Sequence, residues 1–203
     1  MGRKPREELE GGVFHVYARG NNKGLIYADD SDRKLYLRLL EGTVRRRQWR
    51  LLAYCLMNNH VHLLIETPQA NLAVGMQRMH SLYASCFNKR HGRVGHVFQG
   101  RYGAIRVKPD EQLWTVAAYV VANPVRSGLC AEAADWPWSS CAAVLGDGGP
   151  DWIDRARLFE YVGAAGGDAA QRFAELVRNA GSPAGAGLPE EGTAVGASAA
   201  PSC

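Results

Sequence analysis

One short stretch, LMNNHVHLLIET, most constrains how this chain can fold. Its alternating apolar residues predict a β-strand, on which successive side chains point to opposite faces of a sheet. Val61, Leu63 and Ile65 then share a face that belongs against a core. His60 and His62 share the other face, about 7 Å apart. Because neutral imidazole is a common metal ligand, this pair can bind one cation if a third ligand comes from elsewhere; the alternative is a half-exposed strand with two incidental histidines.

Patterns in the first half of the chain place this strand third in a unit of six elements. Alternating β-branched and aromatic residues predict strands, and apolar residues at helical spacing predict helices. The expected order is a strand at 13–19, a helix from 29–32 to about 47, a strand at 49–56, the histidine strand, a helix at 71–90 and a strand at 97–108. This β-α-β-β-α-β order is typical of a ferredoxin-like antiparallel sheet, an α+β fold in which the first and third strands are central. We expect both helices to cover the Val61 face and to leave the histidine face open.

A third helix, expected from Asp110 to Asn123, is apolar nearly all round and should therefore be buried. The open face of the sheet is the surface that would bury it. Tyr119 and Asn123 lie four residues apart and share one side of this helix. Pro124 disfavours helical backbone at the residue before it, so we expect the helix to end or kink near Asn123.

The sequence divides into four regions. We expect a flexible N-terminal lead over 1–12, a main domain over 13–130, an extension with short helices over 131–179 and a disordered tail over 180–203. The extension contains the sequence WPWSS, which we expect to form an aromatic packing patch. The tail is rich in Gly, Ala, Ser and Pro, and such a composition buries too little apolar surface to fold.

Charge is distributed unevenly along the chain. The net charge of +4 combines +11 on residues 1–108 with −7 on residues 109–203. A strongly basic half predicts a polyanionic partner, usually nucleic acid, although a basic solvated surface would have the same composition. The cations that we expect to contact DNA are Arg19, Arg45, Arg46, Arg47, Arg50, Lys89, Arg90, Arg93, Arg101, Arg106 and Lys108.

Other features of the composition argue against several classes of protein. The sequence has no apolar run of transmembrane length, and its charged first residues lack the apolar core of a secretory signal. The five cysteines are scattered without a Cys-x-x-Cys pair, which argues against a zinc knuckle and a disulfide framework. We expect a cytoplasmic, nucleoid-associated protein with no membrane partner.

The polar residues singled out above suggest a reaction. A divalent ion held by His60, His62 and Asn123 would place a Lewis acid near the phenol of Tyr119. A mixed nitrogen and oxygen donor set accepts Mg²⁺ or Mn²⁺, and the sequence does not choose between them. A metal beside a tyrosine suits phosphoryl transfer to the phenol oxygen, through a covalent intermediate that conserves the bond energy.

Other candidate groups receive plainer interpretations. Tyr83 and Tyr102 are rival nucleophiles, but Tyr83 falls in an apolar helical stripe and Tyr102 among arginines, where stacking on DNA bases is expected. Glu66 shares the histidine face and is interpreted as a solvated strand end. The histidines to which we assign no role are His15, His80, His91 and His96.

Four stretches together resemble a known family. They are HVYARGN from His15, MNNHVHLL from Met57, YVVANPVRSG from Tyr119 and WPWSS from Trp136. The combination resembles the HUH single-tyrosine transposases, and most closely the REP-associated tyrosine transposases of bacteria. The His-x-His strand and the Tyr-x-x-x-Asn-Pro helix are specific as a pair, although neither is alone. Asn58 stands at a turn position where relatives often carry proline.

The resemblance implies metal ligands at His60, His62 and Asn123 and a nucleophile at Tyr119. It also implies cleavage and rejoining of single-stranded DNA at hairpin-forming repeats through a 5′-phosphotyrosine, by a monomer or a homodimer. Two alternatives stay open. One is a protein that binds DNA or RNA hairpins without cleaving them, and the other is a metal-dependent hydrolase that uses water and forms no covalent adduct.

Overall fold

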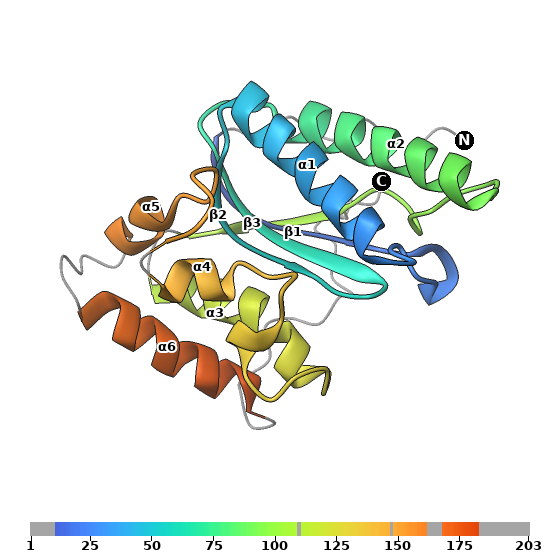
Figure 1. Ribbon diagram of the computed structural model, residues 1–203. Coiled ribbons are helices and arrows are strands. Elements are labelled where there is room, and N and C mark those ends of the chain that lie inside the picture. The colour runs from blue at the N-terminus through green and yellow to red at the C-terminus, as the bar shows by residue number, and fades with distance from the viewer. Residues whose placement is uncertain (1–10, 109–110, 147, 162–167, 183–203) are drawn as a thin grey trace, which may run out of the picture.

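The computed structural model describes residues 11–108, 111–146, 148–161 and 168–182. Its centre is a four-stranded antiparallel sheet with the strand order β2-β3-β1-β4 (Figure 1). The strands are β1 Gly12–Arg19, β2 Arg50–Leu56, β3 His60–Thr67 and β4 Gly103–Val107. The histidine strand β3 and the first strand β1 form the central pair, so the predicted ferredoxin-like fold is confirmed.

Two long helices, α1 Asp30–Arg47 and α2 Leu72–His91, form the layer on one face of the sheet (Figure 1). Asp29 caps α1, because its carboxylate accepts hydrogen bonds from the backbone N–H groups of Ser31 and Asp32. These bonds satisfy donors that the start of a helix otherwise leaves unpaired. The chain leaves α2 through Gly92, whose left-handed backbone is unstrained because glycine has no Cβ.

The buried side of α2 is formed by Leu72, Met76, Met79, Tyr83 and Phe87, and it includes Tyr83 as the helical spacing predicted. On α1 the apolar side chains are buried to different degrees. Tyr36 and Leu40 are buried, whereas Leu35 and Leu39 are partly buried against the same core. Tyr36 can be buried because its hydroxyl has a hydrogen-bonding partner, Nε2 of His80 at 3.0 Å.

The opposite face of the sheet is covered by α3 Glu111–Arg126 and by the elements that follow it (Figure 1). These are a 3-10 turn η2 Ala133–Asp135, α4 Cys141–Leu145, α5 Arg155–Glu160 and α6 Asp168–Gly181. Helix α6 packs on α3, where the rings of Trp114 and Phe173 meet edge to face with centroids 5.6 Å apart. The extension therefore shares one continuous apolar core with the sheet.

The WPWSS segment does more than pack aromatic rings, because it lies along the free edge of β2. The backbone N–H of Leu56 donates to the carbonyl of Trp138 at 2.8 Å, and the N–H of Ser140 donates to the carbonyl of Tyr54 at 3.0 Å. The indole N–H of Trp136 donates to the carbonyl of Leu56 at 3.0 Å. These bonds pair backbone groups that an edge strand would expose to other chains.

Two predictions about the segment before α3 are wrong. The strand expected at 97–108 is confined to β4, and Phe98 makes only an isolated bridge to Gly20. Tyr102 does not face solvent for base stacking, because its ring is buried and lies 6.4 Å from that of His80 between centroids. Helix α3, which we expected to end or kink near Asn123, continues through Pro124 to Arg126.

The ends of the chain are described only in part. Gly12, expected in the flexible lead, belongs to β1, and α6 extends to Gly181, just inside the expected tail. Residues 1–10 and 183–203, on which the rest of those two predictions falls, lie outside the described residues. No helix among the described residues is long and apolar enough to cross a membrane.

Candidate active site and metal centre

The two histidines of β3 project toward α3 from the centre of the sheet. Directly opposite residues of an antiparallel pair point to the same face, and β1 places Tyr17 opposite His62 and Arg19 opposite His60. His62 is buried, and His60 is half-buried. Their rings meet edge to face with centroids 5.1 Å apart. The strand thus holds both imidazoles on a rigid surface, as the alternation predicted.

Helix α3 brings Tyr119 to this surface. The half-buried Tyr119 ring meets the ring of His62 edge to face, with centroids 5.9 Å apart. Arg126 lies with its Cζ atom 5.3 Å from the centroid of the Tyr119 ring, within the range of a cation–π interaction. The histidine strand and the tyrosine helix, which are distant in the sequence, therefore meet in the fold.

Asn123 lies buried one helical turn after Tyr119. Its Nδ2 atom donates to the carbonyl oxygens of Tyr119 at 2.8 Å and of Val120 at 3.3 Å. Pro124 has no N–H, so the Val120 carbonyl lacks its usual helical donor, and the Asn123 amide replaces it. This side-chain bond explains why α3 continues through Pro124. Because the amide nitrogen is engaged, the amide oxygen is the atom that Asn123 can offer to a cation.

The structure adds a histidine to which the sequence gave no role. Nε2 of His15 lies 3.0 Å from Nδ1 of His62, and the two rings are stacked with centroids 5.2 Å apart. The His15 ring also meets Tyr119 edge to face at 6.1 Å. Burial lowers the pKa of His15 to about 4. Burial, followed by the charges of His15 and His60, lowers the pKa of His62 well below its ordinary value.

The imidazole nitrogens fit a divalent cation. Nδ1 of His60 lies 2.7 Å from Oδ1 of Asn59, and Nδ1 of His62 is engaged with His15. Metal-bound histidines usually have their second ring nitrogen hydrogen-bonded in this way, so Nε2 of each ring would be the ligand atom. The described residues contain no group of three His, Cys, Asp or Glu side chains that could hold a metal. The amide oxygen of Asn123 would therefore have to complete the donor set.

The rival groups lie elsewhere. Tyr83 is buried in the layer under α1 and α2, and its hydroxyl donates to the carbonyl of Ile26. The interpretation of Glu66 as a solvated strand end is wrong. Its carboxylate accepts two hydrogen bonds from the Arg157 guanidinium, at 2.9 and 3.0 Å, and its side chain is 14% exposed. Both groups therefore serve the structure.

Some of the predicted DNA-contacting cations lie at the end of the sheet that carries His60. They are Arg19, Lys89, Arg90, Arg93 and Arg101. Arg19 is directly opposite His60, and Gly103, just after Arg101, is opposite Tyr17. Arg90 ties the end of α2 to the start of α1 through an ion pair with Asp29 at 2.6 Å. Arg90 therefore has a structural role besides any contact with DNA.

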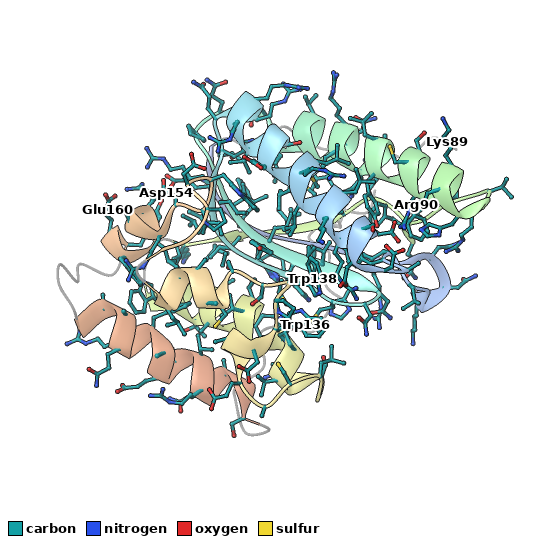
Figure 2. All side chains as sticks on the ribbon, in the orientation of Figure 1. Lys89, Arg90, Trp136, Trp138, Asp154 and Glu160 are labelled. Carbon is teal, nitrogen blue, oxygen red and sulfur yellow. The ribbon has the colours of Figure 1, made fainter. Side chains whose placement is uncertain are left out.

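The other predicted cations lie at the opposite end of the sheet. They are Arg45, Arg46, Arg47, Arg50, Arg106 and Lys108. Arg45 forms a 2.6 Å ion pair with Asp151, and Nε of Arg50 lies 3.8 Å from the Asp154 carboxylate. Figure 2 shows Asp154 on the side of the molecule away from Lys89 and Arg90. The predicted cations therefore form two separate groups, and the second is partly neutralised within the chain.

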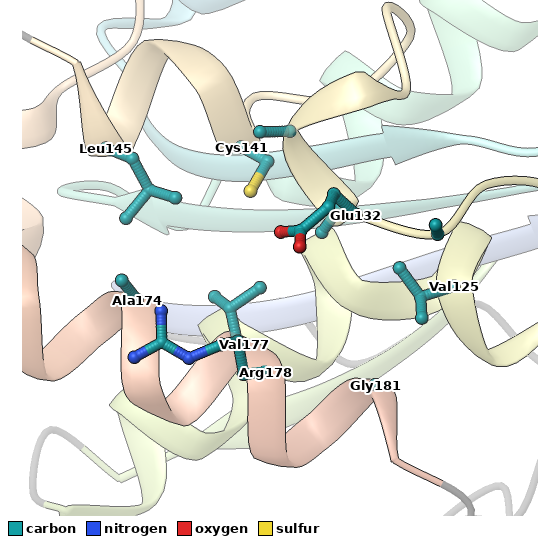
Figure 3. A pocket seen from close by; sticks show the side chains of 11 residues that line it. Val125, Glu132, Cys141, Leu145, Ala174, Val177, Arg178 and Gly181 are labelled. Carbon is teal, nitrogen blue, oxygen red and sulfur yellow. The ribbon is translucent and has the colours of Figure 1, made fainter.

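A pocket of about 140 Å³ opens between α3, α4 and α6 (Figure 3). Its lining is mostly small and apolar, with Glu132 and Arg178 as the charged members. Neither the histidines of β3 nor Tyr119 contributes to it. The pocket is thus separate from the candidate active site.

Comparison with known proteins identifies the family. The sequence model of the family described as "Transposase IS200 like" matches residues 12–123, which include His60, His62, Tyr119 and Asn123. This chain belongs to the IS200-like transposase family. The match begins at β1 and ends within α3, so it contains both elements of the candidate site.

Two proteins similar to this IS200-like transposase carry a more specific name. A Haemophilus influenzae protein, named as a REP-associated tyrosine transposase, is 30% identical over 99 residues, which are 43% of this chain and 56% of that protein. The match thus spans little more than half of that relative. A solved REP-associated tyrosine transposase bound to a REP hairpin matches with a TM-score of 0.58 and 17% identity, over 76% of this chain and 94% of that one. The resemblance stated from the sequence is confirmed, and the second match shows a shared fold.

Proposed function

We propose that this IS200-like transposase cleaves and rejoins single-stranded DNA at hairpin-forming repeats through a 5′-phosphotyrosine on Tyr119. The observation that carries the proposal is the contact between the Tyr119 ring and His62, which brings a phenol to a pair of imidazoles able to hold a cation. A relative of the same fold is bound to a REP hairpin, which supports a hairpin substrate.

In this proposal the Tyr119 phenol oxygen attacks a phosphorus atom of the DNA backbone. The new bond joins the phenol oxygen to phosphorus, the bond to the 3′ oxygen breaks, and the phenol proton finally resides on the 3′-hydroxyl that leaves. Because one phosphodiester replaces another, the reverse attack by a 3′-hydroxyl can rejoin strands. Arg126 restrains the phenol ring, and its charge favours the approach of the anionic backbone.

His60, His62 and the amide oxygen of Asn123 would hold Mg²⁺ or Mn²⁺ beside Tyr119. When bound, such an ion polarises the scissile phosphate and stabilises the charge that develops on its oxygens. The burial of His62 and of Asn123 keeps these donors fixed before the substrate arrives. The cations at the His60 end of the sheet would contact the flanking nucleotides.

A second candidate function is hairpin binding without cleavage. The basic first half of the chain favours it as strongly as it favours an enzyme, because charge serves binding in both cases. Covalent capture separates the two. The protein is mixed with single-stranded hairpin oligonucleotides from the flanks of its own gene, labelled at the 3′ end, with Mg²⁺ or Mn²⁺. We expect a metal-dependent protein–DNA band that resists denaturation in detergent.

Three variants make the capture experiment decisive. Tyr119→Phe and His60→Ala should both lose the band, while Tyr161→Phe should retain it because Tyr161 follows α5, away from the site. Cleavage that survives Tyr119→Phe would indicate a water-using hydrolase or another nucleophile. Tight hairpin binding with neither cleavage nor adduct would favour the binding protein.

A further inference from the structure

We propose that Asn59 and His15 are positioning residues through which both histidines present Nε2 to a cation: Asn59 fixes the hydrogen of His60 on Nδ1, and His15 accepts the Nδ1 hydrogen of His62 when a cation binds. The inference rests on the proposed function, because the cation gives these two residues their role. The hydrogen bonds that support it belong to the protein without metal. One partner comes from the turn before β3 and the other from the neighbouring strand β1.

The hydrogen bonds of the Asn59 side chain determine which nitrogen of His60 carries the hydrogen. Its Nδ2 atom donates to the carbonyl oxygen of Lys23 at 2.9 Å, and a carbonyl oxygen can only accept. This contact orients the amide, so Oδ1, which also only accepts, is the atom that faces Nδ1 of His60 at 2.7 Å. Nδ1 of His60 must therefore carry the hydrogen, and in the neutral ring Nε2 carries the lone pair.

The loop that holds Lys23 is itself anchored to the same turn. The backbone N–H of Gly20 donates to the carbonyl of Asn59 at 2.8 Å, and residues Asn21–Lys23 form a 3-10 turn after it. Asn59 is thus held through both its backbone and its side chain. A side chain fixed at both ends can orient the His60 ring with little further loss of conformational entropy.

The contact between His15 and His62 allows two arrangements of the hydrogen. Between its Nε2 and Nδ1 of His62, 3.0 Å apart, there is room for one hydrogen. If His15 donates, the neutral His62 ring carries its own hydrogen on Nε2 and cannot ligate through that atom. If His62 donates, its Nε2 is available and His15 carries its hydrogen on Nδ1. Cation binding at His62 therefore selects the arrangement in which His15 accepts.

The two rings are also stacked, so packing as well as a hydrogen bond holds His15 against His62. His15 and His62 are nearly parallel, with an interplanar angle of 17°, and both are buried. A phenylalanine at position 15 would keep the apolar stacking and remove the acceptor, whereas a glutamine would keep an acceptor oxygen. These two replacements separate packing from hydrogen bonding.

The first test uses the metal-free protein labelled with ¹⁵N-histidine. Long-range ¹H–¹⁵N spectra distinguish rings protonated on Nδ1 from rings protonated on Nε2. We expect His60 to be the Nδ1–H form, Asn59→Ala to lose that preference, and Asn58→Ala to keep it because the Asn58 side chain accepts from Arg33 instead. A His60 ring protonated on Nε2 in the parent protein would overturn the assignment for Asn59.

The second test measures Mn²⁺ binding by titration, without DNA. Loss of an orienting partner typically weakens metal binding about 10- to 100-fold, so we expect that loss for Asn59→Ala and His15→Phe and substantial recovery for His15→Gln. Thermal unfolding of each variant checks that it is folded. Binding by folded Asn59→Ala and His15→Phe that equals the parent's would overturn the inference. A parent protein that binds no Mn²⁺ would instead contradict the metal in the proposed function, while the spectra would still decide the hydrogen positions.

Discussion

The side-chain amide nitrogen of Asn123 lies 2.8 Å from the carbonyl oxygen of Tyr119, one turn earlier on α3. The same nitrogen reaches the carbonyl of Val120, which Pro124 leaves without a backbone donor. The Asn123 side chain therefore supplies the hydrogen bond that Pro124 cannot donate, and it leaves the amide oxygen without a role in the helix. Asn123 and Pro124 therefore act together, and the effects of replacing them on the free energy of unfolding should not be additive.

This coupling can be measured with a double-mutant cycle. Pro124→Ala restores the N–H that Val120 lacks, so the Asn123 bond to Val120 becomes redundant in that background. We expect Asn123→Ala to destabilise the parent protein by about 1 kcal/mol more than it destabilises Pro124→Ala. Denaturant unfolding of the four proteins gives the coupling. Equal effects of Asn123→Ala in both backgrounds would show that the amide does not substitute for the missing donor.

The sequence predicted the fold and the approach of Tyr119 to the histidine strand, because both follow from local patterns and the element order. Alternation placed His60 and His62 on one strand face, and helical spacing placed Tyr119 and Asn123 on one side of α3. His15 was missed because its role depends on the register between β1 and β3, which no local pattern contains. The sequence left open whether α3 ends or kinks at Pro124, because propensity rules do not include a side chain that replaces the lost donor.

Replacement of two helix glycines by alanine should have opposite effects on the stability of the protein. A Cβ on Gly75 of α2 would lie 2.3 Å from the Trp49 ring, so the ring must move and we expect Gly75→Ala to destabilise the protein by about 1–3 kcal/mol. A Cβ on Gly42 of α1 would meet nothing within 4 Å. Gly42→Ala should therefore stabilise the protein by about 0.5–1 kcal/mol, as expected for an unhindered helix interior. Thermal unfolding compares the two, and a gain in stability from Gly75→Ala would refute the predicted clash.

The Glu66–Arg157 pair should contribute to stability but not to chemistry. It ties the end of β3 distant from His60 to α5 through two hydrogen bonds, and its side chains are 14% and 28% exposed. We expect Arg157→Ala to cost about 2 kcal/mol, because it removes both guanidinium hydrogen bonds from a largely buried carboxylate. Arg45→Ala is the matched control, since the half-exposed Arg45 side chain forms surface ion pairs worth about 0–1 kcal/mol. Both variants should form the covalent DNA adduct at the parental rate.

Stability should fall in mild acid because of buried neutral histidines, and His80 provides a test away from the active site. Burial lowers the pKa of His80 to about 3, so below its ordinary pKa of 6.5 the unfolded chain binds a proton that the folded protein excludes. The resulting loss begins as the pH falls through 6.5 and amounts to about 2 kcal/mol between pH 7 and pH 5. His80→Gln, which can still bond to Tyr36, should reduce the pH-dependent loss by that amount in denaturant titrations. An unchanged pH dependence would mean that His80 is not the proton-linked group.

The two groups of basic residues should differ in their effect on hairpin binding. Lys89 and Arg93 lie at the end of α2, close to the start of α1, and the Asn58 side chain in the turn before His60 accepts a hydrogen bond from Arg33 of α1 at 2.8 Å. This chain of contacts places the first group at the His60 end of the sheet. Arg46 and Arg47 lie at the other end, beyond the reach of the proposed reaction centre.

Charge reversal at either pair changes the net charge of the protein equally, which makes one double variant the control for the other. We expect Lys89→Glu with Arg93→Glu to weaken hairpin binding strongly and to lower the slope of log affinity against log salt by about 1.5, as two lost phosphate contacts predict for single strands. Arg46→Glu with Arg47→Glu should change that slope much less. If both double variants weaken binding to the same extent, binding follows net charge and not a path beside Tyr119. If only the Arg46 and Arg47 variant weakens it, the hairpin binds at the far end of the sheet and reaches the tyrosine from there.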